Sequence, residues 1–239
     1  MDHIIQWILK ITKIVQYQGS PTYFSIWMDD RSAQANWSRL RIHLADNQSP
    51  QYVVGTEMRF RDCNAWYHIV VRIDTTQSTA ANRIRVYVNG GTGNSGGGYS
   101  QLGGLSDEGS QPAQNYDIPG WASGETTTIG NGSSMYLAQM IFADGQSYAP
   151  STFGSFDSNG EWVPNSNPSV TYGNNGYKLD FKADGASAAA DNFGSDSSGN
   201  NNHFTSNNLG SHPSTTDAPE NNFSTLNYLH PYVTTAGLE

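Results

Sequence analysis

Hydrophobic and polar residues alternate most regularly between positions 62 and 90. Two runs in this segment place branched aliphatic residues on one face and mostly polar residues on the other, which is typical of β-strands. The aliphatic positions are Ile69, Val71 and Ile73 in the first run and Ile84, Val86 and Val88 in the second. The connection 75–82 has no helical periodicity, so we predict that the two strands are antiparallel neighbours. Because a lone hairpin is only marginally stable in water, a second sheet is expected to cover the aliphatic face.

Further strands are predicted where short runs rich in β-branched and aromatic residues are bounded by Gly, Asp, Asn or Pro. These runs are 22–28, 40–45, 51–60, 126–129, 135–143 and 177–181, and their Leu137, Ile141 and Phe142 are expected in the core. The first segment of the chain allows two interpretations. Ile4 and Ile8 would lie on one face of a helix, whereas the alternation of Ile5, Trp7 and Leu9 and the excess of β-branched residues favour a strand.

Composition divides the chain into two parts. The Gly-rich and Ser-rich segment 90–132 interrupts the strands as a long loop, either mobile or ligand-binding. Beyond residue 182 the apolar periodicity ends and only scattered Phe and Leu residues remain. We therefore expect an all-β domain at 1–182, followed at 183–239 by a low-complexity tail or inter-domain junction that packs on the domain or leaves it.

The charge and cysteine content limit the partners and the folding compartment. Charged residues make up 14% of the chain and the net charge is −9, which argues against nucleic acid as a partner, because its binding depends on Lys and Arg. No apolar run is long enough for a helix that crosses a bilayer, so no membrane insertion is expected. The single cysteine, Cys63, cannot form an internal disulfide, which suits folding in a reducing cytoplasm.

Four segments, in this order, carry a family resemblance: AWYHIVVRIDTTQSTAANRIRVYVNG, YLAQMIFADGQSYAPSTFGSFDSNGEWVP, YGNNGYKLDFKAD and GSDSSGNNNHFTSNNL. They resemble the concanavalin A-like lectin/glucanase (laminin G-type) domains of tail and other virion proteins of marine phages, over residues 4–227. The resemblance implies a jelly-roll sandwich of two antiparallel sheets with long irregular loops and an extended C-terminal tail. It also implies a virion-associated protein, often with further domains on a longer chain. The strand that usually opens such domains is absent, so we expect either a shortened chain or another segment that closes the sheet.

The acidic residues are not arranged for glycoside hydrolysis. Retaining glycosidases hold two carboxylates about 5 Å apart, commonly on one face of a strand, and no predicted strand here carries that pattern. The histidines also show no metal-like or triad-like grouping. We therefore expect no enzyme activity.

Calcium is the cofactor that the sequence favours, if it binds any. In the stretch DSNGE, Asp157, Asn159 and Glu161 offer oxygen atoms around Gly160, and Asp144 ends a neighbouring predicted strand. Clustered oxygens at a tight turn suit a hard cation, although such residues also form ordinary turns without an ion. The predicted calcium ligands are Asp144, Asp157 and Glu161.

Aromatic residues beside Gly, Pro and Asn indicate a ligand-binding surface. Trp121 and Trp162 occupy such loop positions, where a ring can stack on a sugar while Asp157 and Asn159 hydrogen-bond to its hydroxyl groups. Alternatively, Trp162 packs inward and closes the edge of the sandwich.

Together these features predict a phage virion surface or tail-fibre module that folds in the host cytoplasm and binds a glycan on the host cell surface. Single sites of this kind are weak, so a homo-oligomer is expected, in contact with other virion proteins. The first alternative is a purely structural virion protein without a ligand. A polysaccharide-cleaving enzyme is the less favoured one.

Overall fold

The computed structural model describes residues 2–13, 23–29, 39–45, 51–56, 58–62, 65–92, 111–118, 127–130, 134–182, 192–207 and 218–219. In this part of the chain the regular structure consists of β-strands and two short 3-10 turns, without an α-helix. Every pair of neighbouring strands is antiparallel. The prediction of an all-β, antiparallel fold is thus confirmed. None of the helical turns in the described residues has the length and apolar character needed to span a membrane.

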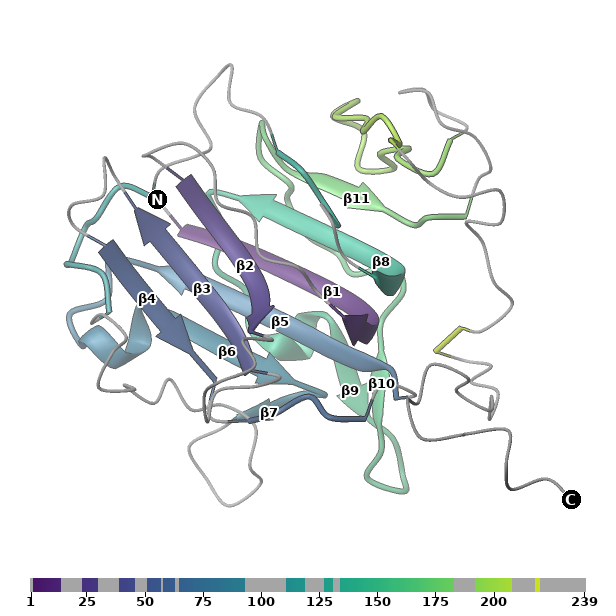
Figure 1. Ribbon diagram of the computed structural model, residues 1–239, viewed down its shortest axis with the longest axis horizontal. Helices are drawn as coiled ribbons and strands as arrows, with labels where there is room; N and C mark the ends of the chain where they lie inside the picture. Colours follow the sequence, from purple (N-terminus) through teal and green to yellow (C-terminus); the bar gives the residue numbers. More distant parts are fainter. Residues whose placement is uncertain are drawn as a thin grey trace, which may run out of the picture.

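The larger sheet has six strands in the order β11-β8-β1-β5-β6-β7 (Figure 1). They are β1 Asp2–Lys13, β5 Tyr67–Asp74, β6 Ile84–Val88, β7 Gly91–Thr92, β8 Ser134–Asp144 and β11 Tyr177–Leu179. β5 and β6 are antiparallel neighbours, with Ile69 opposite Val88, and the short turn η1 (Ala80–Asn82) lies between them. The predicted hairpin is therefore confirmed. The first segment is a strand, which pairs with β5 on one side and β8 on the other.

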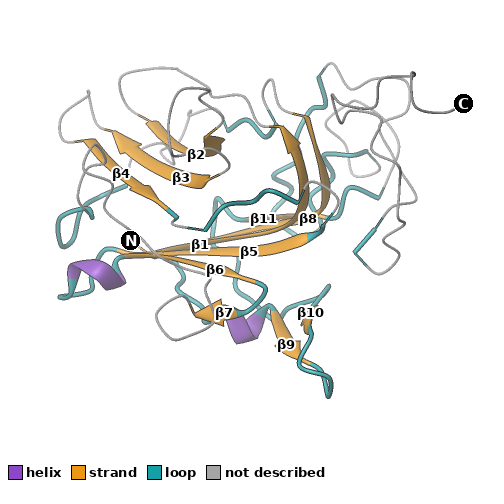
Figure 2. Ribbon diagram, turned by 60° about the horizontal axis from the view of Figure 1, so that its bottom comes forward, coloured by secondary structure: helices purple, strands orange, loops and turns teal. Residues whose placement is uncertain are grey.

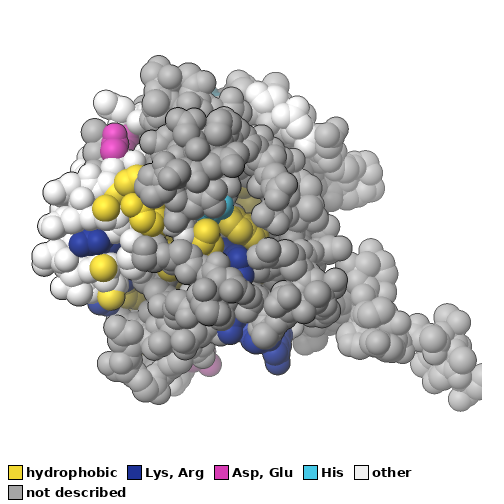
Figure 3. Space-filling view, turned by 60° about the vertical axis from the view of Figure 1, so that its left-hand side comes forward, with side chains coloured by type: hydrophobic (Ala, Val, Ile, Leu, Met, Phe, Trp, Pro, Cys, Tyr) yellow, Lys and Arg dark blue, Asp and Glu magenta, His cyan; other side chains and the backbone are white. Residues whose placement is uncertain are grey.

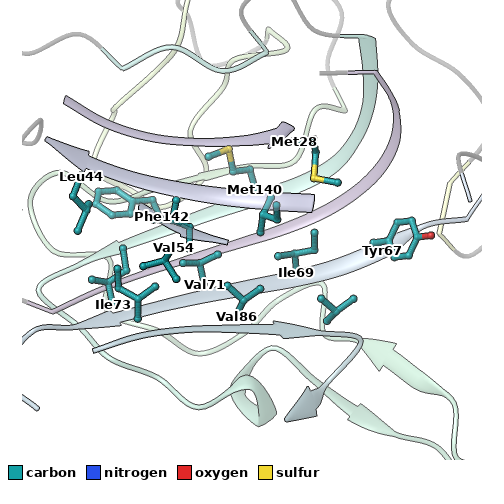
Figure 4. Close-up of a cluster of buried hydrophobic side chains, with 14 of the residues drawn as sticks. Met28, Leu44, Val54, Tyr67, Ile69, Val71, Ile73, Val86, Met140 and Phe142 are labelled. Atoms are coloured by element: carbon teal, nitrogen blue, oxygen red, sulfur yellow. The ribbon is translucent and has the colours of Figure 1, made fainter. Parts of the chain in front are cut away.

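The second sheet has three strands, β2 Tyr23–Asp29, β3 Arg39–Ala45 and β4 Gln51–Gly55, in the order β2-β3-β4. It lies over one face of the larger sheet (Figure 2). A single cluster of buried side chains from both sheets fills the space between them, including Leu44 and Val54 from the smaller sheet and Ile69, Val71 and Phe142 from the larger one (Figure 4). The aliphatic face of β5 and β6 is thus covered by a second sheet, as the alternation predicted.

A third group of residues covers the opposite face of the larger sheet. It comprises the turn η2 (Pro150–Thr152) and the hairpin of β9 (Gly154–Phe156) and β10 (Trp162–Pro164), which Figure 2 shows on the side away from the smaller sheet. We call residues 148–172 the outer layer. A second buried cluster forms beneath it, made of Val70, Tyr87, Ile141, Ala143 and Phe153. Both faces of β5 are therefore covered, whereas the alternation of aliphatic and polar residues predicted cover for the aliphatic face alone.

Two other strand predictions differ from the structure. The run 51–60 ends as a strand at Gly55, and Thr56 then pairs with Leu40 through both its backbone N–H and its hydroxyl oxygen, at 2.9 and 3.1 Å. The run 126–129 is not a strand in its described residues, 127–129. Both runs contain β-branched residues, so β-propensity alone did not locate the strands correctly.

Val70→Ala and Val71→Ala are each expected to destabilise the chain, by about 1.5–3 kcal/mol. The two residues are neighbours on β5 but point into different clusters, Val71 into the first and Val70 into the second. Urea denaturation should give similar losses for both variants. As a control, Tyr136→Ala on β8 removes a ring that is 42% exposed and should change stability little. A Val70→Ala variant as stable as the wild type would mean that water reaches the face of β5 under the outer layer.

Candidate functional site

The β9–β10 hairpin places several of the predicted site residues together. In this hairpin Trp162 lies directly opposite Phe156, so the two rings share one face. The turn 157–161 joins the strands, and its Gly160 has a φ of +82°, a conformation that favours glycine. Asp157 and Asn159 thus lie in the turn that joins the strand of Phe156 to the strand of Trp162.

Asp157 organises the turn through its own backbone and carboxylate. Its N–H donates to the carbonyl of Glu161 at 2.9 Å, and its Oδ1 accepts the N–H groups of Asn159 and Glu161 at 2.8 and 2.9 Å. The hydrogen bond from the Glu161 N–H, with those from Asn159, holds the pKa of the Asp157 carboxyl below its ordinary value against the opposing effect of desolvation. The turn is therefore formed by its own residues, and Asp157 stays charged.

Trp162 anchors the hairpin to the larger sheet. Its Nε1–H donates to Nδ1 of His68 on β5 at 2.8 Å, and the two rings are stacked with centroids 5.7 Å apart. Gly90 and Gly154 allow this close approach, because a Cβ at either position would lie 2.0 or 2.4 Å from the nearest carbon of the indole ring. The indole thus lies against the sheet and is only partly exposed.

His68 is neutral in this arrangement. Its Nδ1 accepts the indole hydrogen, so the ring proton resides on Nε2. Nε2 is buried and has no acceptor among the described residues. Burial lowers the pKa of His68 to about 4, because the charged form would lose its hydration.

Phe156 is the ring that the hairpin exposes. It is 57% exposed and meets Trp162 edge to face, with centroids 5.1 Å apart and an angle of 70° between the rings. Val163, on the other face of the hairpin, is 50% exposed. Sequence reasoning missed Phe156. The signal that could have found Phe156 is its position just before an Asp-x-Asn-Gly turn. A turn there places Phe156 opposite Trp162, the residue that follows the turn.

The other predicted site residues lie elsewhere. Trp121 is outside the described residues. Asp144, at the end of β8, accepts hydrogen bonds at Oδ2 from the backbone and side-chain nitrogens of Asn175, at 3.3 and 2.9 Å. Of the other loop aromatics, Tyr148 and Tyr172 pack on the second buried cluster.

The predicted calcium ligands Asp144, Asp157 and Glu161 do not form a three-residue metal-binding group in the described residues. Calcium is usually bound by six to eight oxygens, including more than one carboxylate. In the described part of the chain, no three side chains of the His, Cys, Asp and Glu types lie close enough to hold a metal ion. Asp157 directs Oδ1 at its own turn and Asp144 bonds to Asn175. Calcium binding through Asp144, Asp157 and Glu161 stays a prediction.

Asp196 is a buried carboxylate that holds a segment of the chain in place, unlike the exposed Asp157. Its Oδ1 accepts the N–H groups of Lys178 and Ser198 at 2.8 and 2.9 Å. Its Oδ2 accepts the Ser198 hydroxyl and the Asn202 N–H at 2.8 and 2.9 Å. These bonds attach the segment 192–207 to β11, where Leu179 also forms a bridge with Asp196. The residue is therefore structural, since each of its oxygens already has two donors.

No protein-family model, curated protein or solved structure matches this chain. Its function must be inferred from its own residues and from the resemblance of its sequence motifs.

Acidification is expected to destabilise the fold through His68. Its pKa is about 4 in the folded chain and 6.5 in the unfolded one, so as the pH falls the unfolded chain takes up the proton first. The stabilisation is complete above about pH 6.5 and declines towards pH 4, a loss of about 3 kcal/mol.

The measurement is urea denaturation at several pH values for the wild type and His68→Gln. Part of the pH dependence should disappear in the variant, because the titrating group is gone. Equal pH dependence in the two proteins would contradict the assignment of a neutral, buried His68.

Asp196→Asn is expected to destabilise the chain by about 2 kcal/mol or more, because an amide nitrogen would face a donor and the carboxylate charge would be lost. Asp157→Asn is the matched control, since it makes the same chemical change in an exposed turn and should have a much smaller effect. Urea denaturation at neutral pH measures both. A similar small loss in the two variants would show that Asp196 does not hold 192–207 in place.

Proposed function

We propose that this chain is a carbohydrate-binding module of concanavalin A-like, jelly-roll type, displayed on the surface or tail fibre of a phage virion. The observation that carries the proposal is an exposed aromatic ring, Phe156, next to the polar turn 157–161. The four sequence motifs that resemble virion lectin-like domains support the same function. The two packed antiparallel sheets are compatible with the fold that this resemblance implies.

The hairpin has the chemistry that recognition of a sugar needs. The C–H face of a sugar ring can pack on the negative face of an aromatic ring, and Phe156 offers an exposed ring supported by Trp162. Sugar hydroxyl groups donate hydrogen bonds to carboxylates and amide oxygens. Asp157, Asn159 and Glu161 are exposed beside the ring. Among the described residues, Oδ2 of Asp157 meets only the side-chain nitrogen of Asn159, at the long distance of 3.4 Å.

One hairpin of this size binds weakly. A single ring and a few polar groups bury little surface, so an affinity of about millimolar to micromolar is expected. Adhesion to a host cell therefore requires several copies on one particle, where the effective concentration of linked sites raises avidity. The proposal accordingly includes a homo-oligomer in contact with other virion proteins.

A structural virion protein without a ligand is the second candidate. Phe156 and Val163 are exposed apolar residues on the two faces of the same hairpin. A neighbouring subunit that covered both would gain apolar burial without any glycan.

Phe156→Ala and Asn159→Ala are each expected to weaken glycan binding about tenfold, the loss that corresponds to about 1.4 kcal/mol. The assay is an array of bacterial surface polysaccharides probed with a multimerised chain. Tyr136→Ala, which removes an exposed ring from β8, is the matched control and should bind normally. Trp121→Ala tests the second predicted ring in the same assay.

Absence of binding to every polysaccharide would favour the structural candidate. The structural candidate would also be favoured if Phe156→Ala and Asn159→Ala both bound glycans as strongly as the Tyr136→Ala control.

A further inference from the structure

Two arginines lie side by side on the outer face of the larger sheet. Arg72 on β5 is directly opposite Arg85 on β6. Two positions along the register lies the pair Val70 and Tyr87, which belongs to the buried cluster under the outer layer. Because side chains alternate along a strand, Arg72 and Arg85 project from the same face as this pair. Both arginines are partly exposed.

Two like charges at opposed positions of neighbouring strands repel each other. Residues in this register have Cβ atoms about 5 Å apart, and like charges there destabilise a sheet. Within the described residues, neither Arg72 nor Arg85 forms an ion pair. The Nε atoms of both guanidinium groups are buried without an acceptor, and the hydrogen bond of Arg85 goes to the side-chain oxygen of Asn82.

The neighbouring Arg83 shows what a structural arginine looks like in this fold. Its Nε, Nη1 and Nη2 donate to the backbone carbonyls of Gln77, Pro112 and Ser78, at 2.9, 2.8 and 3.0 Å. Asp74, the next acidic residue along the face of β5, accepts the side chains of Thr76 and Gln77 at 2.6 Å each. Arg72 and Arg85 therefore differ from Arg83, since their donors are not used in this way by the described residues.

The overall charge makes this pair unusual. The chain has 21 acidic and 12 basic residues, so carboxylates that could neutralise an arginine are plentiful. On the face that Figure 3 displays, the described surface is mainly uncharged and the Lys and Arg side chains form small separate groups. Among the described residues, no carboxylate pairs with either arginine, so the two form a local positive site in an acidic chain.

We propose that Arg72 and Arg85 bind an oxyanion, namely the carboxylate or phosphate group of an acidic saccharide. Guanidinium groups bind such groups through parallel N–H···O bonds. An oxyanion between the two side chains would remove their repulsion and accept hydrogen bonds from the guanidinium groups. The buried Val70 and Tyr87 beside them reduce the screening by water. The saccharide as carrier rests on the proposed glycan-binding function, whereas the oxyanion site itself does not.

The test measures direct binding by calorimetry at low, matched ionic strength. The probes are inorganic phosphate, glucose 6-phosphate and glucuronate, with glucose as the neutral comparison. The proteins are the wild type, Arg72→Gln, Arg85→Gln and the matched control Arg61→Gln, which makes the same charge change at an exposed position. At least one of the charged probes should bind the wild type and the control, and bind Arg72→Gln and Arg85→Gln at least about tenfold more weakly. Glucose should not depend on either arginine.

Thermal unfolding without a ligand gives a second, independent measurement. Arg72→Gln should leave the Tm unchanged or raise it, because the substitution removes a like-charge contact. A lower Tm would mean that Arg72 already has a stabilising partner, and would overturn the proposal. Equal binding of the charged probes by all four proteins, or no binding of any charged probe by the wild type, would also overturn it.

The two proposals can fail separately. Charged probes that bind through Arg72 and Arg85, together with an array on which no polysaccharide binds, would retain the oxyanion site and remove the glycan-binding function. If Phe156→Ala weakened glycan binding and no charged probe bound through the arginines, the glycan-binding function would be retained and the oxyanion site removed. Binding of phosphate and glucose 6-phosphate without glucuronate would identify a phosphorylated saccharide, and the opposite preference would identify a uronate.

Discussion

The structure depends on the burial of both faces of β5. A strand can be buried on a face that carries polar groups only if those groups find partners or remain uncharged. On the outer face Val70 supplies apolar surface, while His68 stays neutral and accepts the indole N–H of Trp162. The donor for His68 lies on β10, so this requirement fixes where the β9–β10 hairpin packs. The position of the hairpin is thus a consequence of core formation, although its exposed side faces solvent.

Local sequence pattern identified the inner core but not the outer layer. Ile69 and Val71 alternate with polar residues, and both belong to the core between the two sheets. His68 and Arg72 on the other face resemble the polar side of a strand that faces water. The residue that covers His68 is 94 positions away, and periodicity over a few residues contains no information about such a contact. β9 and β10 have three residues each, which is too short for any period to be recognised.

For the candidate site, the sequence predicted residue types that could bind a sugar but not how the aromatic rings are arranged. Asp157, Asn159 and Trp162 do lie in one hairpin. The exposed ring, however, is Phe156, whereas Trp162 lies beneath it against Gly90. The reason is geometric, because Phe156 and Trp162 lie opposite each other and share one face of the hairpin. Trp162 is the ring that packs on the sheet, since it has an N–H donor for His68 and a glycine at its contact. Sequence reasoning cannot decide between two such rings without the partner surface.

The anchoring of the hairpin has a consequence for ligand binding. A ring on a free two-stranded hairpin would have to be ordered when the ligand binds, and the lost entropy would reduce an affinity that is already small. Trp162 removes much of this freedom in advance, because its indole is held by His68 and by close contacts at Gly90 and Gly154. Phe156 then packs against a ring whose position is set by the core. Residues that never touch a ligand therefore determine how the binding ring is presented, since any side chain at Gly90 would have to displace the indole. The outer layer also leaves Arg72 and Arg85 partly exposed on the same face of the sheet. The packing that buries the core therefore also decides which side chains a ligand can reach.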